Sequence, residues 1–407
     1  MTARRVGLGI AVVAAIVIAV ATLMPRVPAA HPGNYDPRCR ICGPMTGVDL
    51  VGNVLLFMPL GAGLAIAGFT RRRAVQAGAL ASVAIELLQL AVIPGRDPSL
   101  VDVLANTLGT LGGVLIGAHW RTLVSPSRQA STVLAAASGA AYIAMIAAVS
   151  WALGPGLPEG PWYLERGIGT RLKPSGQVLD ARASSEPMVG DTMTNVPTVR
   201  RDLLAGKPVT VTAAIAPGPS QATSFIQILD TSLDNIVTID RRGDDAAFFS
   251  RLRGGSLRLQ RIGVRLPGFF ATSVGDTVTL SGARVGPRLE IAGERNGRAS
   301  SITLLLTPGV GWALFVSFRG GLVTGTMLSD IAWTILLLLP FAYWSGRAAR
   351  LTSPLRWHLT RLGVACAGIG LVPLVFRIGP SHWWEWLGAM VALLAGHLAA
   401  TAGASSD

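Results

Sequence analysis

Long apolar stretches occupy both ends of the chain, and a more polar stretch separates them. Five apolar runs lie between residues 6 and 153, and three more lie between about residues 310 and 400. About 20 apolar residues are enough for an α-helix to cross the ~30 Å hydrocarbon layer of a membrane. The pattern therefore predicts about eight membrane-spanning helices. The predicted spans are Val6–Met24, Val51–Phe69, Ala74–Ile93, Leu100–Ala118, Thr132–Leu153, Thr326–Trp344, Leu362–Phe376 and Trp386–Ala400.

Two apolar runs have an alternative interpretation. The first run follows Arg4 and Arg5, as the apolar part of a cleaved signal peptide would. Its length, and the second apolar run that soon follows it, favour a retained membrane helix. The shorter Val310–Phe318 run is partly aromatic and fits either a span or a segment at the membrane interface.

Small residues predict close contact between helices in the first apolar block. Gly109, Gly113 and Gly117 repeat at i,i+4 spacing, which places them on one helix face. Such a stripe of small residues lets two membrane helices approach closely. Pro59 removes one backbone hydrogen bond and predicts a kink in its helix.

Residues 154–307 have a different pattern, in which short runs alternate apolar and polar residues. The runs recur at about 8–12-residue spacing with turn residues between them, which is typical of an antiparallel sandwich. The predicted strands are Pro208–Ala216, Ser224–Asp230, Asn235–Arg241, Ala247–Leu252, Ser256–Ile262, Asp276–Ala283, Arg288–Ala292 and Ser300–Leu306.

These patterns together predict a polytopic α-helical membrane protein with an extracytoplasmic all-β sandwich domain. Residues 1–153 would form a bundle of about five helices, and residues 154–307 the β domain. Residues 308–407 would form a C-terminal region of about three helices.

Composition supports a membrane protein. The 407-residue chain is 50% hydrophobic and only 14% charged, whereas soluble globular proteins carry about 25% charged residues. A net charge of +13 would also fit nucleic-acid binding. However, many arginines flank the apolar runs, where they set the orientation of membrane helices. We therefore expect no nucleic-acid partner, cytoplasmic termini, and a β domain outside the cytoplasm.

Polar residues within the apolar helices are the main functional candidates. Ionisable groups inside a membrane are costly and mark functional sites by default. Three predicted helices or their starts carry polar pairs at i,i+3 or i,i+4 spacing, which puts each pair on one helix face. A rise of ~1.5 Å per residue places them in the outer half of the bilayer. The candidate binding residues are Asp49, Asn53, Glu86, Gln89, Arg96, Asp102 and Asn106.

Two roles are open for this set. The polar side chains could satisfy one another and hold the helices together. They could instead form a pocket open to the outer leaflet, with Glu86, Arg96 and Asp102 as candidates for catalytic residues. No common nucleotide-binding or hydrolase motif is evident, so the sequence favours a binding protein over an enzyme.

Cysteines and aspartates offer weaker signals. Cys39 and Cys42 form a C-x-x-C pair in a predicted outer loop, where a disulfide or a redox-active pair could form. The five histidines are scattered, so no metal centre is predicted. The acidic segment Asp230–Asp245 could hold calcium, although a solvated loop is the favoured interpretation. No other cofactor is expected.

An ordered series of motifs in the first helices resembles a known family. Asp49-x-x-x-Asn53-x-x-x-Phe57-x-Pro59-x-Gly61 precedes Ser82-x-x-x-Glu86-x-x-Gln89, and then come Arg96 and Asp102-x-x-x-Asn106-x-x-Gly109. Over about residues 5–120 this series resembles the VanZ-like family of bacterial membrane proteins. The resemblance implies a small helical module in the bacterial plasma membrane. For the family's namesake it implies lowered susceptibility to lipoglycopeptide antibiotics, and it implies no established reaction.

The β domain resembles the concanavalin A-like (laminin G-like) jelly roll through PVTVTAAIAP from Pro208 and GDTVTLSG from Gly275. That resemblance implies glycan binding, in some cases with calcium. We therefore expect a cell-envelope protein that contacts membrane lipids and binds or shields a lipid-linked or cell-wall glycan, in a role like glycopeptide resistance. The alternatives are a membrane enzyme with Glu86 as acid or base, and an assembly protein with an unidentified protein partner.

Overall fold

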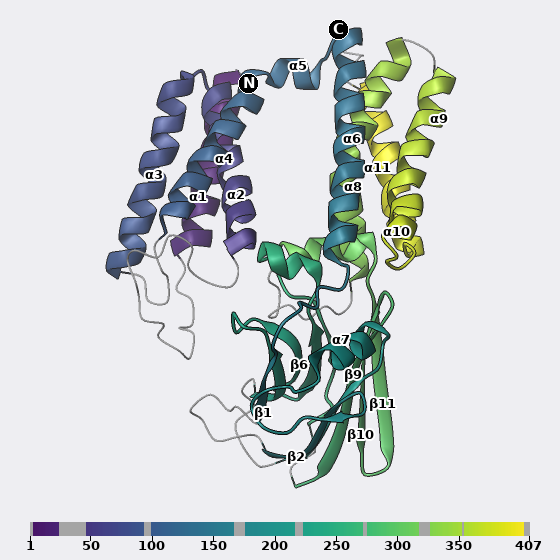
Figure 1. The fold of residues 1–407 in the computed structure, drawn as a ribbon. Coiled ribbons are helices and arrows are strands. Elements are labelled where there is room, and N and C mark those ends of the chain that lie inside the picture. Colours follow the sequence, from purple (N-terminus) through teal and green to yellow (C-terminus); the bar gives the residue numbers. More distant parts are fainter. Residues whose placement is uncertain are drawn as a thin grey trace. The chain divides into compact units, whose positions relative to one another are not determined.

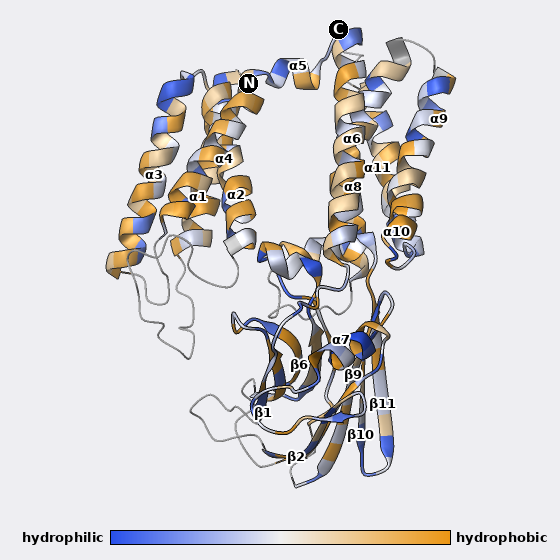
Figure 2. Ribbon diagram, viewed as in Figure 1, coloured by the Kyte–Doolittle hydropathy of each residue, from blue (hydrophilic) through white to orange (hydrophobic). Residues whose placement is uncertain are grey.

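The computed structural model of the chain divides into two compact units, Met1–Ala130 and Ser131–Asp407 (Figure 1). The structure describes residues 3–23, 46–92, 99–166, 176–215, 223–271, 275–316, 326–351 and 354–402. The described elements of the first unit are helices, and the second unit contains both helices and β strands. Figure 2 shows hydrophobic residues along the helices of both units, and a mixture of polar and apolar residues over the β region.

Within the described ranges, eight helices are long and apolar enough to cross a membrane, which confirms the predicted number. The helices of the first unit are α1 (Ala3–Leu23), α2 (Thr46–Ile66), α3 (Arg71–Val92), α4 (Leu100–Ala118) and the short α5 (Trp120–Val124). The others are α6 (Arg128–Ala152), α8 (Met327–Leu351), α9 (Pro354–Ala365) and α11 (Trp383–Ala402). A π-helical turn, Cys366–Leu371, joins α9 to α10 (Val372–Val375), so that one span runs from Leu355 to Val375.

In the first unit, glycines bring α2 and α4 into backbone contact. A Cβ atom added to Gly109 would overlap the carbonyl oxygen of Val54, and one added to Gly113 would overlap that of Met58. Gly63 of α2 lies as close to α1, because its Cβ would be 2.6 Å from the backbone nitrogen of Ala11. The glycine stripe therefore packs helices together, as its spacing predicts.

The β region consists of two antiparallel sheets, with strand orders β1-β5-β6-β7-β8 and β11-β10-β9-β4-β2-β3. Alternation buries one face of each, as in β4, where Val209, Val211, Ala213 and Ile215 are buried. The first sheet contains β1 (Tyr163–Arg166), β5 (Thr223–Leu229), β6 (Asn235–Arg242), β7 (Asp245–Ser250) and β8 (Gly263–Leu266). The second contains β2 (Gly176–Ala183), β3 (Glu186–Pro187), β4 (Val209–Ile215), β9 (Thr277–Val285), β10 (Arg288–Arg295) and β11 (Arg298–Leu305).

The strand predictions coincide with β4 to β7 and β9 to β11, but one of them is wrong. The run Ser256–Ile262 begins inside a 3-10 turn, Arg253–Leu257, and the next strand starts only at Gly263. Arg258 has a φ of 53°, a left-handed conformation that no strand residue adopts. The helix α7 (Val196–Leu204), which covers part of β9, was also not predicted.

The β sheets and the helices of the second unit share one hydrophobic core. Val149 of α6, Val310 and Ile378 are buried in the same cluster as the inner faces of the sheets. Val310 belongs to a buried 3-10 turn, Pro308–Leu314. The described part of the predicted run Val310–Phe318 therefore forms no spanning helix. In the middle of α6, Tyr142 packs with Phe341 of α8 and Ala392 of α11 in a second hydrophobic cluster. The expected boundaries at residues 153/154 and 307/308 stay predictions.

The glycine contacts in the first unit generate a testable pair of variants. Gly113→Ala should destabilise the protein by about 1–3 kcal/mol, because backbone atoms of α2 occupy the space that the new Cβ needs. Gly112→Ala, one residue earlier, is the control, since only the Met58 side chain approaches that position, at 3.9 Å. It should leave stability unchanged or raise it by up to ~1 kcal/mol through helix propensity. Detergent unfolding of the purified protein measures both, and equal effects would contradict the packing argument.

Candidate functional site

The predicted polar residues of the first unit gather near one end of α2, α3 and α4. We call Asn53, Ser82, Glu86, Gln89, Asp102 and Asn106 the polar cluster. Glu86 is only 8% exposed and Asn106 only 2%, and Ser82 and Gln89 are also buried. Helices α3 and α4 thus bury polar groups in the same region, and Asn53 of α2 is half-buried there, which makes this region the candidate site of the first unit.

Hydrogen bonds of the polar cluster tie the four long helices of the first unit together. The Asn53 amide of α2 donates to Asp102 Oδ1 of α4 at 2.9 Å. The Asn106 amide of α4 donates to Ser82 Oγ of α3 at 2.8 Å. The Gln89 amide of α3 donates to the carbonyl oxygen of Thr22 in α1 at 2.9 Å. The polar cluster therefore stabilises the helix bundle of the first unit.

Glu86 holds the start of α4. Its Oε2 accepts a hydrogen bond from the backbone N–H of Ser99 at 2.8 Å. Ser99 is the N-cap of α4, and its own hydroxyl accepts from the backbone N–H of Val101 at 3.2 Å. A carboxylate is favoured beside a helix N-terminus, where unsatisfied N–H groups carry partial positive charge. The geometry therefore assigns Glu86 a positioning role at the start of α4.

Asn106 retains binding capacity. Its Oδ1 is buried and has no hydrogen-bond partner among the described residues, although its amide group is bonded to Ser82. A buried acceptor without a partner costs about 1–3 kcal/mol. Asn106 is thus a fixed acceptor that a hydroxyl or N–H group of a ligand could satisfy.

Other predicted site residues are placed less fully. Asp49 lies in the first turn of α2 and is exposed. Arg96, Cys39 and Cys42 lie outside the described residues, so that the pairing of Glu86 with Arg96 and the C-x-x-C disulfide stay predictions.

In the acidic segment of the β domain, arginines accompany the carboxylates. Asp230 is bonded to Arg251, and Asp245 Oδ2 accepts from Arg265 at 2.9 Å. Burial acts to raise the pKa of Asp230, but hydrogen bonds from Arg251 and from backbone N–H groups hold it below its ordinary value. Among the described residues, no group of three or more acidic, histidine or cysteine side chains could hold a metal ion.

Asp240 of β6 is the most buried of these aspartates. It accepts from Ser224 Oγ at 2.7 Å and from Arg242 at 3.3 Å. Burial raises its pKa, and these two hydrogen bonds only partly oppose the increase. Gln227 extends the row by donating to Ser224 at 2.6 Å. Neighbouring strands β5 and β6 therefore carry a row of hydrogen-bonding side chains.

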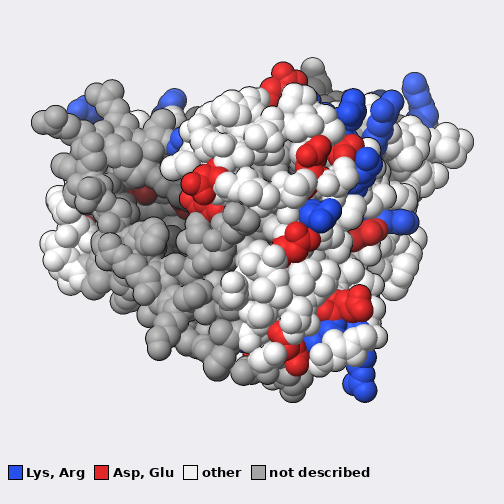
Figure 3. Space-filling model, turned by 60° about the horizontal axis from the view of Figure 1, so that its bottom comes forward, with Lys and Arg blue, Asp and Glu red and all other residues white. Residues whose placement is uncertain are grey.

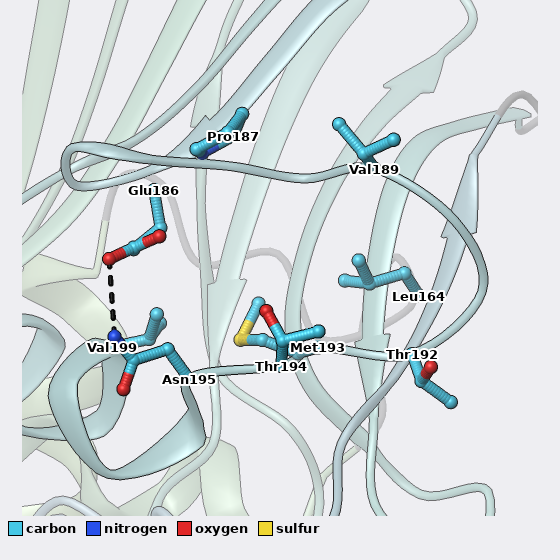
Figure 4. A pocket seen from close by; sticks show the side chains of 9 residues that line it. All are labelled: Leu164, Glu186, Pro187, Val189, Thr192, Met193, Thr194, Asn195 and Val199. Carbon is cyan, nitrogen blue, oxygen red and sulfur yellow. Dashed lines mark hydrogen bonds between the residues drawn. The ribbon is translucent and has the colours of Figure 1, made fainter.

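A small hollow of about 20 Å³ lies between β3 and the start of α7 (Figure 4). Its one charged lining residue, Glu186, accepts a hydrogen bond from the Asn195 amide at 3.3 Å. The remaining lining is mostly apolar or hydroxyl-bearing, and small-molecule sites usually enclose about 300–1,000 Å³. The hollow therefore offers little that would bind a ligand specifically.

The sequence did not single out a pair of buried carboxylates in the second unit. Asp330, in the first turn of α8, and Glu385, in the first turn of α11, are both 0% exposed. Asp330 accepts from the indole N–H of Trp312 at 2.9 Å and from that of Trp384 at 3.0 Å. Glu385 accepts from the backbone N–H groups of Gly309 at 2.9 Å and His382 at 3.2 Å. These contacts join the end of the β region to the helices. We call the set the junction cluster, which consists of Gly309, Trp312, Asp330, His382, Trp384 and Glu385.

Comparison with known proteins supports the first unit's identity. Residues 14–121 match the family model VanZ/LLP1, which confirms the resemblance to VanZ-like proteins over α2 to α4 and the second half of α1. The match includes every residue of the polar cluster. No curated protein and no solved structure matches the chain. The jelly-roll resemblance of the two antiparallel sheets stays a prediction.

The junction cluster generates a prediction about stability. Asp330→Asn replaces one of two acceptor oxygens with an N–H donor, so that one indole N–H loses its buried partner. We expect a loss of about 2–4 kcal/mol in the free energy of unfolding. Tryptophan fluorescence during detergent unfolding measures it directly, since Trp312 and Trp384 are the donors. Asp244→Asn, at an exposed aspartate of the β domain, is the control and should leave stability unchanged.

Proposed function

We propose that this chain is a VanZ-type protein of the bacterial cell envelope that binds a lipid-linked glycan component at the outer leaflet of the plasma membrane and shields it. The observation that carries the proposal is the buried, unpaired acceptor of Asn106 beside the carboxylates of the polar cluster. A purely structural network would be expected to satisfy all its buried groups. An oxygen acceptor and carboxylates are suited to hydroxyl and N–H groups, which sugars carry in abundance.

The depth of the polar cluster fits a headgroup rather than an acyl chain. Glu86 lies six residues before the end of α3 at Val92, and Asn106 lies six residues after the start of α4 at Leu100. At ~1.5 Å per residue, both lie ~9 Å from the ends of their helices. Polar parts of a membrane-anchored molecule reach this level, whereas its hydrocarbon tail extends deeper.

From alternate crossing of the membrane we infer that the polar cluster and the β domain face the same side of the bilayer. The end of α3, the start of α4 and the end of α6 share that side, and the β domain follows α6. Arg71, Arg72 and Arg73 at the start of α3, and Arg121 in α5, are then on the opposite side. Positive residues favour the cytoplasm, which supports an extracytoplasmic β domain and cytoplasmic termini.

The β domain supports a glycan more than a strongly charged ligand. The row formed by Gln227, Ser224 and Asp240 offers both donors and acceptors, as recognition of sugar hydroxyls requires. On the face shown in Figure 3, acidic and basic side chains are interspersed. We propose that this domain contacts glycan.

Binding is favoured over catalysis by the position of Glu86. Its carboxylate already accepts from the backbone N–H of Ser99, the N-cap of α4, so this oxygen is engaged in positioning a helix. If an antibiotic binds the same glycan, the protein would confer resistance by shielding that glycan and not by catalysing a reaction.

Binding of a polyprenyl-diphosphate-linked glycan to the full-length protein in nanodiscs tests the proposal. Asn106→Leu, of similar volume, should weaken binding about tenfold, the effect of losing one or two buried hydrogen bonds. Thr107→Val is the control, because the Thr107 hydroxyl donates only within its own helix, to the Val103 carbonyl at 2.7 Å. It should bind as the unchanged protein does.

Two results would overturn the proposal. One is wild-type affinity in Asn106→Leu, and the other is no measurable binding of either the lipid-linked glycan or soluble cell-wall fragments to the unchanged protein. Release of a product from the bound lipid, abolished in Glu86→Gln with binding retained, would favour the enzymatic alternative instead.

A further inference from the structure

Arg361 is buried between three helices of the second unit, far along the chain from the polar cluster. It lies on α9 and is only 4% exposed. Its Nε donates to the hydroxyl of Ser345 on α8 at 2.8 Å, and its Nη1 lies 3.5 Å from Nδ1 of His397 on α11. The guanidinium group is therefore held in place from two sides, by α8 and α11.

Neither of these partners compensates the positive charge of Arg361. A hydroxyl is neutral, and an imidazole nitrogen that accepts from a guanidinium N–H belongs to a neutral ring. In the described part of the chain, no carboxylate lies within 4 Å of Arg361, whereas Arg251 and Arg265 of the β domain each pair with an aspartate. A buried charge without an opposite charge is strongly destabilising.

Donor capacity also remains open on the same guanidinium group. Nη2 is buried and has no hydrogen-bond partner among the described residues. It lies beside Gly346, whose missing Cβ would be only 2.8 Å away. Glycine at this position is required by close packing, because its Cβ would also lie 2.8 Å from the Cβ of Ala400. Arg361 thus combines a charge that no described carboxylate compensates with a buried, unused donor.

The position along the helices fits a group at the membrane surface. Ser345 lies six residues before the end of α8 at Leu351, and Arg361 seven residues after the start of α9 at Pro354. At ~1.5 Å per residue, both lie ~9–11 Å from that end of the helices. This end is opposite the one that contacts the β region, as Figure 1 shows for the second unit. Long side chains at such depths reach toward the headgroup layer.

We propose that Arg361, positioned by Ser345 and His397, binds a phosphate group between α8, α9 and α11. Guanidinium N–H groups match phosphate oxygens in geometry and charge, and such charge-assisted hydrogen bonds are among the strongest in proteins. The phosphate is either the phosphodiester of an anionic phospholipid or free inorganic phosphate.

Thermal unfolding of the purified full-length protein tests the site, with phosphatidylglycerol, phosphatidylcholine or inorganic phosphate added in separate arms. Phosphatidylglycerol should stabilise the unchanged protein more than the zwitterionic phosphatidylcholine does. In Arg361→Gln, the apparent affinity for the anion should fall about tenfold or more. Arg356→Gln is the matched control, because it removes the same charge from an exposed position on the same helix. It should keep most of the response.

Two further variants keep the test decisive if Arg361→Gln does not fold. Arg361→Lys retains the charge but loses the forked N–H geometry, and Ser345→Ala removes the hydroxyl that holds Nε. Both should weaken anion binding by several-fold while Arg356→Gln does not. A response to phosphate alone would identify a soluble anion as the ligand and support the site. The proposal would be overturned if the Arg361 variants responded to the lipid and to phosphate as strongly as Arg356→Gln does. It would also be overturned if the unchanged protein showed no response to either.

Discussion

The architecture of the second unit depends on burying two carboxylates where the helices meet the β region. A fully buried carboxylate must be surrounded by donors, because losing water without replacement costs several kcal/mol. The donors for Asp330 and Glu385 come from Trp312 and Gly309 after the last strand, and from the start of α11. The chain can satisfy both carboxylates only by bringing these segments together. The β region is therefore attached to its helices through a polar contact as well as a shared hydrophobic core.

The same requirement distinguishes structural polar groups from candidate binding groups. In the junction cluster both oxygens of Asp330 have donors, and the cluster needs no ligand. Asn106 and Arg361 differ, since each has one group bonded within the protein and another that is buried and unused among the described residues. The bonded group fixes the side chain. The unused group is buried without a hydrogen bond, which costs free energy, and a ligand that bonds to it would remove this cost. Asn106 presents an acceptor and Arg361 a donor, so they would select ligands of opposite character.

The sequence predicts elements better than it predicts contacts between them. Hydropathy was enough for the eight helices, and alternation was enough for β4 and β9, which are half-buried along their whole length. β3 has only two residues, too few for any period to emerge. Helical spacing placed Asn53 and Asn106 among the polar candidates, but not their partners. The partner of Gln89 is the Thr22 carbonyl near the end of α1, and a backbone acceptor leaves no trace in the sequence. The sequence did not identify Asp330, inside the predicted span Thr326–Trp344, or Glu385, just before the span Trp386–Ala400, because their donors lie on distant segments or on the backbone and leave no spacing signal.

The arginines show why a sum of charges conceals function in a membrane protein. Hydropathy placed Arg361 just before a span starting at Leu362, where it would be one more basic residue that orients a helix. The helix instead begins at Pro354, so that Arg361 is two turns inside it and buried. Arg356, on the same helix, is exposed and fits the orienting role. The two residues contribute equally to the net charge of +13. Only the packing of α8 and α11 around Arg361 makes one of them a candidate binding group and leaves the other a marker of topology.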